Sequence, residues 1–151
     1  MEKDRKMASL KAYFYRAADR LGVFDRDRAL QSASKRGDVS AVKALLEAKA
    51  NLHAQTDGAL RLASWAGHAE VVRLLLGAGA DVHADEEASL HNAVAENHPE
   101  VVMALLQAGA NVHAREDEPL RYATSLSFPE VKQILEDWIT KHPATPRLCP
   151  S

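Results

Sequence analysis

Histidines are the residues of this chain whose type and spacing could do chemistry. His53, His83 and His113 recur thirty residues apart, and each is followed by alanine. Two or more imidazoles would form a zinc site if their nitrogens converged to ~2.0–2.1 Å from one ion. Packed helical units lie roughly 8–10 Å apart, so a ladder of equivalent histidines does not converge on one metal. We therefore expect these side chains to hydrogen-bond turn backbone within or between repeats, with no metal and no cofactor bound.

The remaining sequence offers no pattern typical of catalytic residues. A glycine-rich phosphate loop and a GxSxG motif are both missing from the sequence. The single cysteine, Cys149, follows several prolines, which is a poor setting for an oriented nucleophile. We expect no catalytic residues. A metal-dependent enzyme or metal-binding protein that uses the histidine ladder stays as an alternative hypothesis.

The thirty-residue spacing extends well beyond the histidines, to the apolar residues that must position them. Leucine recurs at positions 30, 60, 90 and 120, alanine at 33, 63, 93 and 123, and Leu-Leu pairs begin at 45, 75 and 105. Self-similarity of this length is the signature of stacked structural units that bury their apolar faces against one another.

Each copy contains two short helical patterns. In the second copy Leu60 and Ala63 share a helix face, Gly67 breaks the run, and residues 71–76 give a second apolar stripe. Gly79 and Gly109 follow the second helix, where glycine accepts the left-handed conformation of a C-terminal cap. Lys49 replaces this glycine in the first copy, at a cost of ~1 kcal/mol if the conformation is kept.

Two segments, GHAEVVRLLLGAGADVHA (67–84) and NHPEVVMALLQAGANVHA (97–114), resemble the ankyrin repeat pattern. The resemblance covers roughly residues 27–139 and implies an all-α ankyrin-repeat solenoid of about four helix-turn-helix repeats. His68 and His98 match the family's Gly-His turn, where they should orient the turn. The period here is thirty residues rather than the common ~33. The missing residues fall where the family builds its projecting finger, so we expect short fingers with few or no regular strands.

The chain is expected to divide into three parts. They are an N-terminal capping helix and connector (1–26), ankyrin repeats over 27–139 (27–56, 57–86, 87–116 and 117–139), and a flexible C-terminal tail (140–151). Within the capping helix one apolar face is expected to cover the first repeat; it holds Met7, Leu10, Phe14, Ala17 and Leu21.

The resemblance also implies where a partner protein would bind, namely the concave face formed by the fingers and the exposed positions of each first helix. The exposed pairs would be Lys35-Arg36, Trp65-Ala66, Ala95-Glu96 and Ser125-Leu126. The partner-binding residues predicted on this basis are Trp65, Asp85, Glu86, Glu87, Glu96, Arg115, Glu116, Asp117, Glu118, Ser125 and Leu126. Trp65 is the expected apolar anchor because tryptophan is enriched at interface hot spots.

Charge is divided along the chain. Residues 1–49 hold twelve Lys/Arg and seven Asp/Glu, a balance of +5, whereas residues 85–118 hold one Arg and eight Asp/Glu, a balance of −7. Like charges on adjacent fingers would repel, so a partner with a basic surface is favoured. The net charge of −2 argues against nucleic acid and anionic membranes, with a nucleic-acid binder kept as an alternative.

These observations predict a cytoplasmic, monomeric protein. Its charged N-terminus does not resemble a secretory signal, and one cysteine allows no intrachain disulfide. The predicted function is non-catalytic protein binding by a stand-alone inhibitor, immunity-type or adaptor protein.

Overall fold

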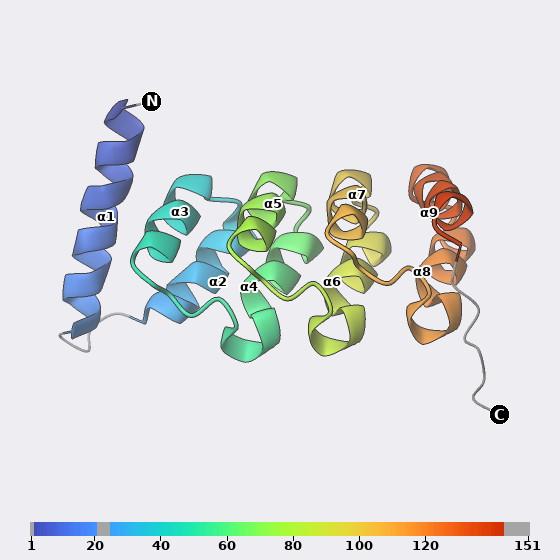
Figure 1. Cartoon of the computed structure of the whole chain (residues 1–151), viewed down its shortest axis with the longest axis horizontal. Coiled ribbons are helices and arrows are strands. Elements are labelled where there is room, and N and C mark those ends of the chain that lie inside the picture. Colours follow the sequence, from blue (N-terminus) through green and yellow to red (C-terminus); the bar gives the residue numbers. More distant parts are fainter. Residues whose placement is uncertain (1, 21–24, 144–151) are drawn as a thin grey trace.

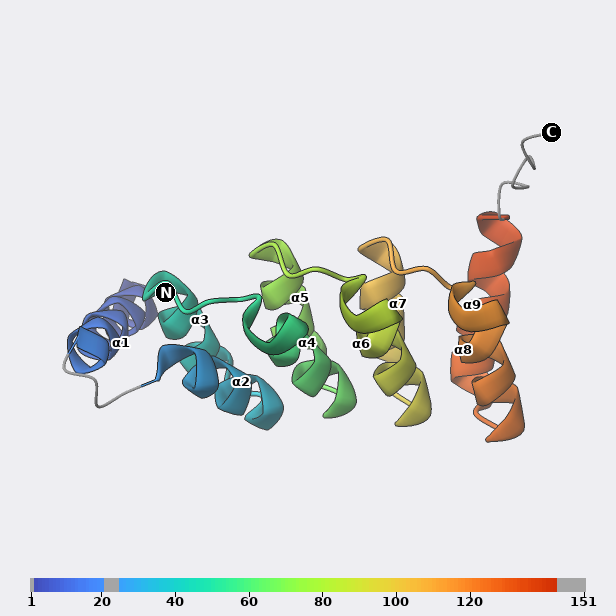
Figure 2. The ribbon, with the colours of Figure 1, turned by 90° about the horizontal axis from the view of Figure 1, so that it is seen from below.

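The computed structural model describes residues 2–20 and 25–143, and its regular elements are all α-helices. Helix α1 spans Glu2–Arg20. Four helix pairs follow it: α2 (Arg26–Arg36) with α3 (Val39–Glu47), α4 (Ala54–Trp65) with α5 (Ala69–Gly77), α6 (Ala84–Ala95) with α7 (Pro99–Gln107), and α8 (Ala114–Ser125) with α9 (Pro129–Lys141). The pairs stack side by side into an elongated solenoid (Figures 1 and 2), so the predicted all-α solenoid of about four repeats is confirmed.

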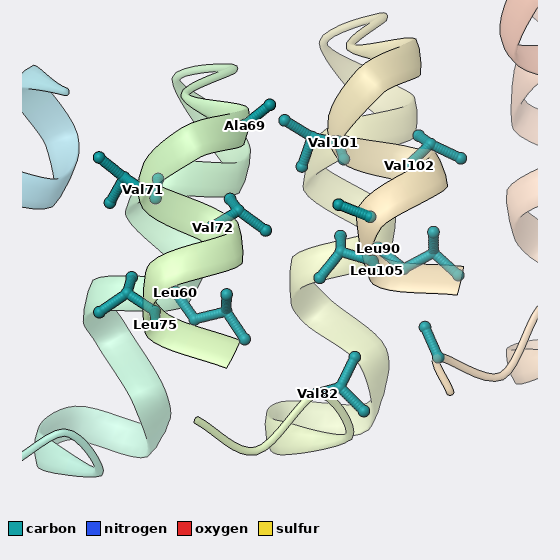
Figure 3. Packing of buried hydrophobic residues seen from close by; sticks show 14 of the residues in the cluster. Leu60, Ala69, Val71, Val72, Leu75, Val82, Leu90, Val101, Val102 and Leu105 are labelled. Atoms are coloured by element: carbon teal, nitrogen blue, oxygen red, sulfur yellow. The ribbon is translucent and has the colours of Figure 1, made fainter. Parts of the chain in front are cut away.

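The helices form two rows with the core between them. Helices α2, α4, α6 and α8 make one row, and α3, α5, α7 and α9 make the other, with α1 beside α3 at its end (Figure 1). The recurring leucines meet between the rows; Leu60 and Leu90 face Leu75 and Leu105 in Figure 3, and all four are fully buried. Each such side chain stabilises the stack by about 1.5–3 kcal/mol relative to exposure. The periodic leucines are therefore the residues that hold the repeats together.

The second helices of the second and third pairs end as the sequence predicts. Gly79 and Gly109 both have φ of 99° and lie two residues after the ends of α5 and α7. Lys49 keeps the same left-handed conformation with φ of 65°, although its side chain makes this conformation costly. The thirty-residue register therefore fixes the turn geometry even where the favourable residue is absent.

Each finger is a short left-handed turn. Three runs of three residues have φ between 50° and 66°: Gln55–Asp57, Asp85–Glu87 and Arg115–Asp117. None contains glycine, so each residue costs roughly 1–2 kcal/mol that its surroundings must offset. These turns are continuous with the helices that follow them, and no strand occurs in residues 2–20 or 25–143. The prediction of short fingers without regular strands is confirmed.

Some of the predicted boundaries between parts of the chain fall inside helices. The boundary predicted after residue 56 falls inside α4, and the tail predicted to begin at residue 140 overlaps the end of α9 at Lys141. The rest of that tail, from residue 144, lies outside the described residues. The repeat boundaries stay a prediction. No helix in the described ranges is both long and apolar enough to cross a membrane.

The predicted packing face of the capping helix is wrong. Met7, Leu10 and Phe14 are 60%, 66% and 67% exposed, Ala17 is also exposed, and Leu21 lies outside the described residues. Helix α1 instead packs on α3 through Ala12, which is 5% exposed, and the half-buried Tyr15.

The thirty-residue register explains this orientation. Ala12 and Tyr15 lie thirty positions before Val42 and Leu45, two buried residues of α3. Helix α1 thus occupies the place of a second helix in a preceding repeat (Figure 1). Lys11 Nζ donates to Ser40 Oγ at 3.2 Å, and the Arg16 guanidinium donates to the Glu47 carbonyl, so both polar contacts also join α1 to α3.

Candidate functional site

The histidine ladder is part of the fingers. Nδ1 of His53 lies 3.1 Å from Asp57 Oδ2, Nδ1 of His83 lies 2.5 Å from Glu87 Oε1, and Nδ1 of His113 lies 2.6 Å from Asp117 Oδ1. Because a carboxylate can only accept, Nδ1 carries the proton in each pair. The expectation that these rings bond turn backbone is wrong: each bonds the acid four residues later, across the left-handed turn.

The buried acid of the finger also joins one repeat to the next. Asp57 is 4% exposed, and its Oδ1 accepts from the backbone N–H of Asp81 at 2.9 Å. Asp27, thirty residues earlier, accepts from the N–H of Asn51 at 2.6 Å in the same way. One carboxylate therefore closes its own finger and fixes the start of the following one, which helps offset the left-handed backbone.

Glu87 is the equivalent of Asp57 in the next finger, but it does not bond the backbone of the following repeat. Its residue is 6% exposed, Oε1 bonds His83, and Oε2 is buried without a hydrogen-bond partner among the described residues. The hydrogen bond from Glu87 raises the pKa of His83 above the ordinary histidine value; partial burial opposes this, and the charges of Glu87 and Asp81 add to it. Glu87 was predicted to face a partner, but its carboxylate is directed into the molecule.

These contacts give the metal hypothesis no support. Each ladder histidine uses Nδ1 to bond a carboxylate of its own finger. In the described part of the chain no three His, Cys, Asp or Glu side chains are grouped so that they could hold a metal ion.

A second pair of histidines links neighbouring repeats by their backbones. His68 Nε2 donates to the Lys35 carbonyl at 3.1 Å, and His98 Nε2 donates to the Trp65 carbonyl at 3.0 Å. A Cβ on Gly67, whose φ is 78°, would lie 2.6 Å from the His98 ring. The glycine is therefore required by the histidine of the next repeat as well as by its own turn, and these two histidines have the turn-orienting role expected for them.

Trp65 lies at the centre of the first-helix row. Its side chain is partly exposed, the residue being 45% accessible, on the last residue of α4. The indole Nε1 donates to Glu96 Oε1 at 3.1 Å, and Lys35 Nζ lies 5.4 Å from the ring centroid. One side chain thus connects three consecutive repeats, and the ring is held in a fixed orientation with almost half of the residue accessible.

The predicted finger acids are largely paired inside the protein. Asp85 pairs with Arg61 at 2.6 Å, and Glu86 pairs with Arg115 at 3.3 Å. Glu118 lies 3.6 Å from both Arg115 and His91, and Asp117 pairs with His113 as described above. Glu116 is exposed and makes no ion pair within the described ranges. The repulsion expected between adjacent fingers is therefore reduced by Arg61 and Arg115. A count of charges along the sequence does not show that these two arginines lie beside the acids.

Residues around α8 extend this surface. Glu118, Arg121, Tyr122 and Ser125 line a shallow pocket of about 260 Å³. Leu126 is 44% exposed and Tyr122 37% exposed, and the Tyr122 ring lies 5.4 Å from that of His91. Sequence reasoning named Ser125 and Leu126 but missed Arg121 and Tyr122, although the helical spacing from Glu118 to Tyr122 and Ser125 is the signal that could have found them.

Comparison with known families agrees with this architecture. The family model for ankyrin repeats in three copies matches residues 9–86, and the model for a single ankyrin repeat matches residues 85–117. The first match begins within α1, as expected if α1 continues the repeat register. No curated protein is similar enough to the chain to count as a match.

Proposed function

The chain belongs to the ankyrin repeat family, and from this premise we propose that it binds another protein through the exposed side of α2, α4, α6 and α8 and the adjoining fingers. Ankyrin repeats are generally protein-interaction modules. The finer proposal is a stand-alone inhibitor, immunity-type or adaptor protein, which acts by covering a surface of its partner and catalyses no reaction.

The observation that carries the proposal is the fixed, half-exposed indole of Trp65. Lys35 and Glu96 hold it from the two neighbouring repeats, so little side-chain entropy is lost when a partner covers the ring. Large aromatic side chains held in this way are the usual anchors of protein interfaces. Tyr122 of α8 and Leu126, the residue that caps the C-terminal end of α8, are both exposed and provide further apolar area on the same row of helices.

The charges around this anchor favour a partner with basic groups. The paired acids Asp85 and Glu86 remain more than half exposed at their side chains, and Glu116 is exposed. Exposed ion pairs contribute little, so a basic side chain of a partner can replace Arg61 or Arg115 at small cost. Their role is then to speed association and set specificity rather than to supply most of the affinity.

The experiment compares variants against a partner purified from the native host by affinity capture. Trp65→Ala should cost at least 2 kcal/mol, about thirtyfold in affinity, mainly through faster dissociation. The Glu86→Lys and Glu116→Lys pair should slow association and weaken its salt dependence. Surface plasmon resonance gives both rates.

Arg73→Ala is the matched control, because Arg73 is exposed on α5, the other helix of the same repeat. It should bind as the unmodified protein does. If the Trp65 and finger variants also bind unchanged, the partner uses another surface and the proposal is wrong.

A further inference from the structure

The N-terminal end of the stack carries an uncovered apolar stripe. Met7, Leu10, Tyr13 and Phe14 are 60–75% exposed, and they are four of the seven large hydrophobic residues exposed in the described part of the chain. Met7, Leu10 and Phe14 lie on the side of α1 opposite to Ala12, the residue that packs on α3, and Tyr13 lies between the two sides. Exposed apolar groupings of this kind mark interaction sites.

The position of α1 explains why this side is bare. In the later repeats the second helix packs against its own first helix and against its neighbours in the row, as α5 does with α4 and α7. Helix α1 stands at the end of the row, and its main packing within the described residues is against α3 (Figure 1). In the thirty-residue register Phe14 matches Ala44 and Ala104, which are buried in α3 and α7, so this part of the stripe is a face on which a further helix of the row would stack. Leu10 matches Ser40, Glu70 and Glu100, which are exposed, so the stripe extends from that face toward the outer side of the row.

The stripe is self-complementary. Its apolar positions 7, 10, 14 and 17 are symmetric about residue 12, with spacings of three, four and three. If two such helices lie antiparallel across a two-fold axis, Leu10 of each meets Phe14 of the other, and Met7 meets Ala17. At the outer positions the large side chain of Met7 is then opposed by the small side chain of Ala17. The dipoles of two antiparallel helices also attract each other weakly.

We propose that this face binds a second copy of the chain, with the two α1 helices antiparallel and the two stacks joined end to end at their N-terminal ends. The contact places a second α1 beside the first, on the side of the row where no helix of the same chain lies (Figure 1), and its antiparallel direction differs from that of the parallel helices α5 and α7. The opposite end offers no equivalent apolar surface, because Lys132 and Glu136 of α9 stand thirty residues after the buried Val102 and Leu106 of α7 and pair with each other at 3.6 Å. The association therefore closes as a dimer instead of propagating. It does not depend on the function proposed above.

Sedimentation velocity of the full chain between about 5 and about 200 µM tests the proposal. One helix face on each side is a small interface, so we expect a weak dimer whose fraction rises across this range. Apolar contact should persist in about 0.5 M NaCl, whereas attraction between the basic N-terminal part of one copy and the acidic finger region of another should be lost. A chain that stays monomeric throughout, or associates only at low salt, overturns the proposal.

Variants locate the contact. Phe14→Glu and, separately, Leu10→Ser should each weaken the dimer at least about tenfold, with helix content unchanged by circular dichroism. Two variants are used because the serine change remains informative if the charged residue disturbs α1. Leu126→Glu is the matched control, because Leu126 is an exposed leucine directly after α8 and its change should leave the dimer unchanged. If Leu126→Glu abolishes the dimer and the α1 variants do not, the face is wrongly assigned.

The antiparallel arrangement has its own test, made with Cys149→Ser in the background. A mixture of Leu10→Cys and Phe14→Cys proteins should form crosslinked heterodimers faster than either protein crosslinks with itself. Faster self-crosslinking of each variant would indicate parallel helices and overturn the two-fold arrangement.

Discussion

The two ends of the solenoid differ in the polarity of the helix face that they expose. Both α1 and α9 end the row of second helices (Figure 1). On α9 the ion pair of Lys132 and Glu136 stands thirty residues after the buried Val102 and Leu106 of α7, whereas α1 exposes Met7, Leu10 and Phe14. Terminal units of repeat proteins need a polar outer face to stay soluble. The C-terminal end satisfies this requirement in its own sequence, whereas the N-terminal end satisfies it only when another chain covers it.

The ends differ in attachment as well. Val131 and Leu135 of α9 are fully buried against the stack, while α1 contributes Ala12 and a half-buried Tyr15. The connections between fingers show the opposite trend, since Asp27 and Asp57 bridge to the next repeat and Glu87 does not. The C-terminal part therefore depends more on apolar burial, and the N-terminal part more on carboxylate bridges.

The largest expected effect on stability comes from weakening the apolar packing of α9. Leu135→Ala removes a fully buried side chain and should lower the free energy of unfolding by about 2–5 kcal/mol. Tyr15→Ala in α1 should cost less than half of that, because Tyr15 is only half-buried and α1 packs mainly on one helix, α3. Urea unfolding followed by circular dichroism gives both values.

Amide hydrogen exchange provides the control for this comparison. Backbone amides of α1 should exchange faster than those of α9 in dilute protein, where the dimer is dissociated. Equal costs for the two variants, together with equal protection of the two helices, would mean that the ends are attached equally well.

A smaller effect should come from restoring a bridge in the third repeat. Glu87→Asp gives this finger the residue found at positions 27, 57 and 117. An aspartate can bond the ring of His83 and also accept from the backbone N–H of Asn111, as Asp57 does with His53 and Asp81. We expect a stability gain of about 0.5–1.5 kcal/mol in urea unfolding. Asp57→Glu is the reciprocal variant and should lose a similar amount; a gain there would show that the bridge does not stabilise the stack.

The fold could be predicted because burial repeats. Leu60 and Leu90 occupy equivalent sites, so the sequence shows each packing position several times. The orientation of α1 was also encoded, since Ala12 and Tyr15 continue the columns of Val42 and Leu45. Met7, Leu10 and Phe14 form the more apolar stripe, so amphipathicity alone predicts the opposite orientation.

The interactions of the fingers could not be predicted in the same way. Gln55–Asp57 adopts a left-handed turn without glycine, so no residue type signals the conformation. That turn directs the third residue inward, which places Asp57 and Glu87 inside the protein rather than on a binding surface. Arg61 and Arg115 reach acids on neighbouring fingers only because of the repeat stacking. Charge counted along the sequence therefore overstated the acidity that a partner meets.

The smallest expected effect is a pH dependence of stability caused by His83, which bonds Glu87 in the finger that lacks a carboxylate bridge to the next repeat. Because the pKa of His83 is raised in the folded protein, protonation favours folding. The stabilisation is complete below the unfolded-state pKa of about 6.5 and is lost as pH rises through the higher folded-state value. The stability advantage of the unmodified protein over His83→Gln should thus be larger at about pH 5.5 than at about pH 8. The His83 side chain is 59% exposed, so solvent screening keeps the difference small. Glu87→Gln removes the carboxylate that is the main cause of the shift and should reduce this pH dependence in the same urea titrations. An advantage that grows toward pH 8 would mean that the neutral ring is the form that stabilises the finger.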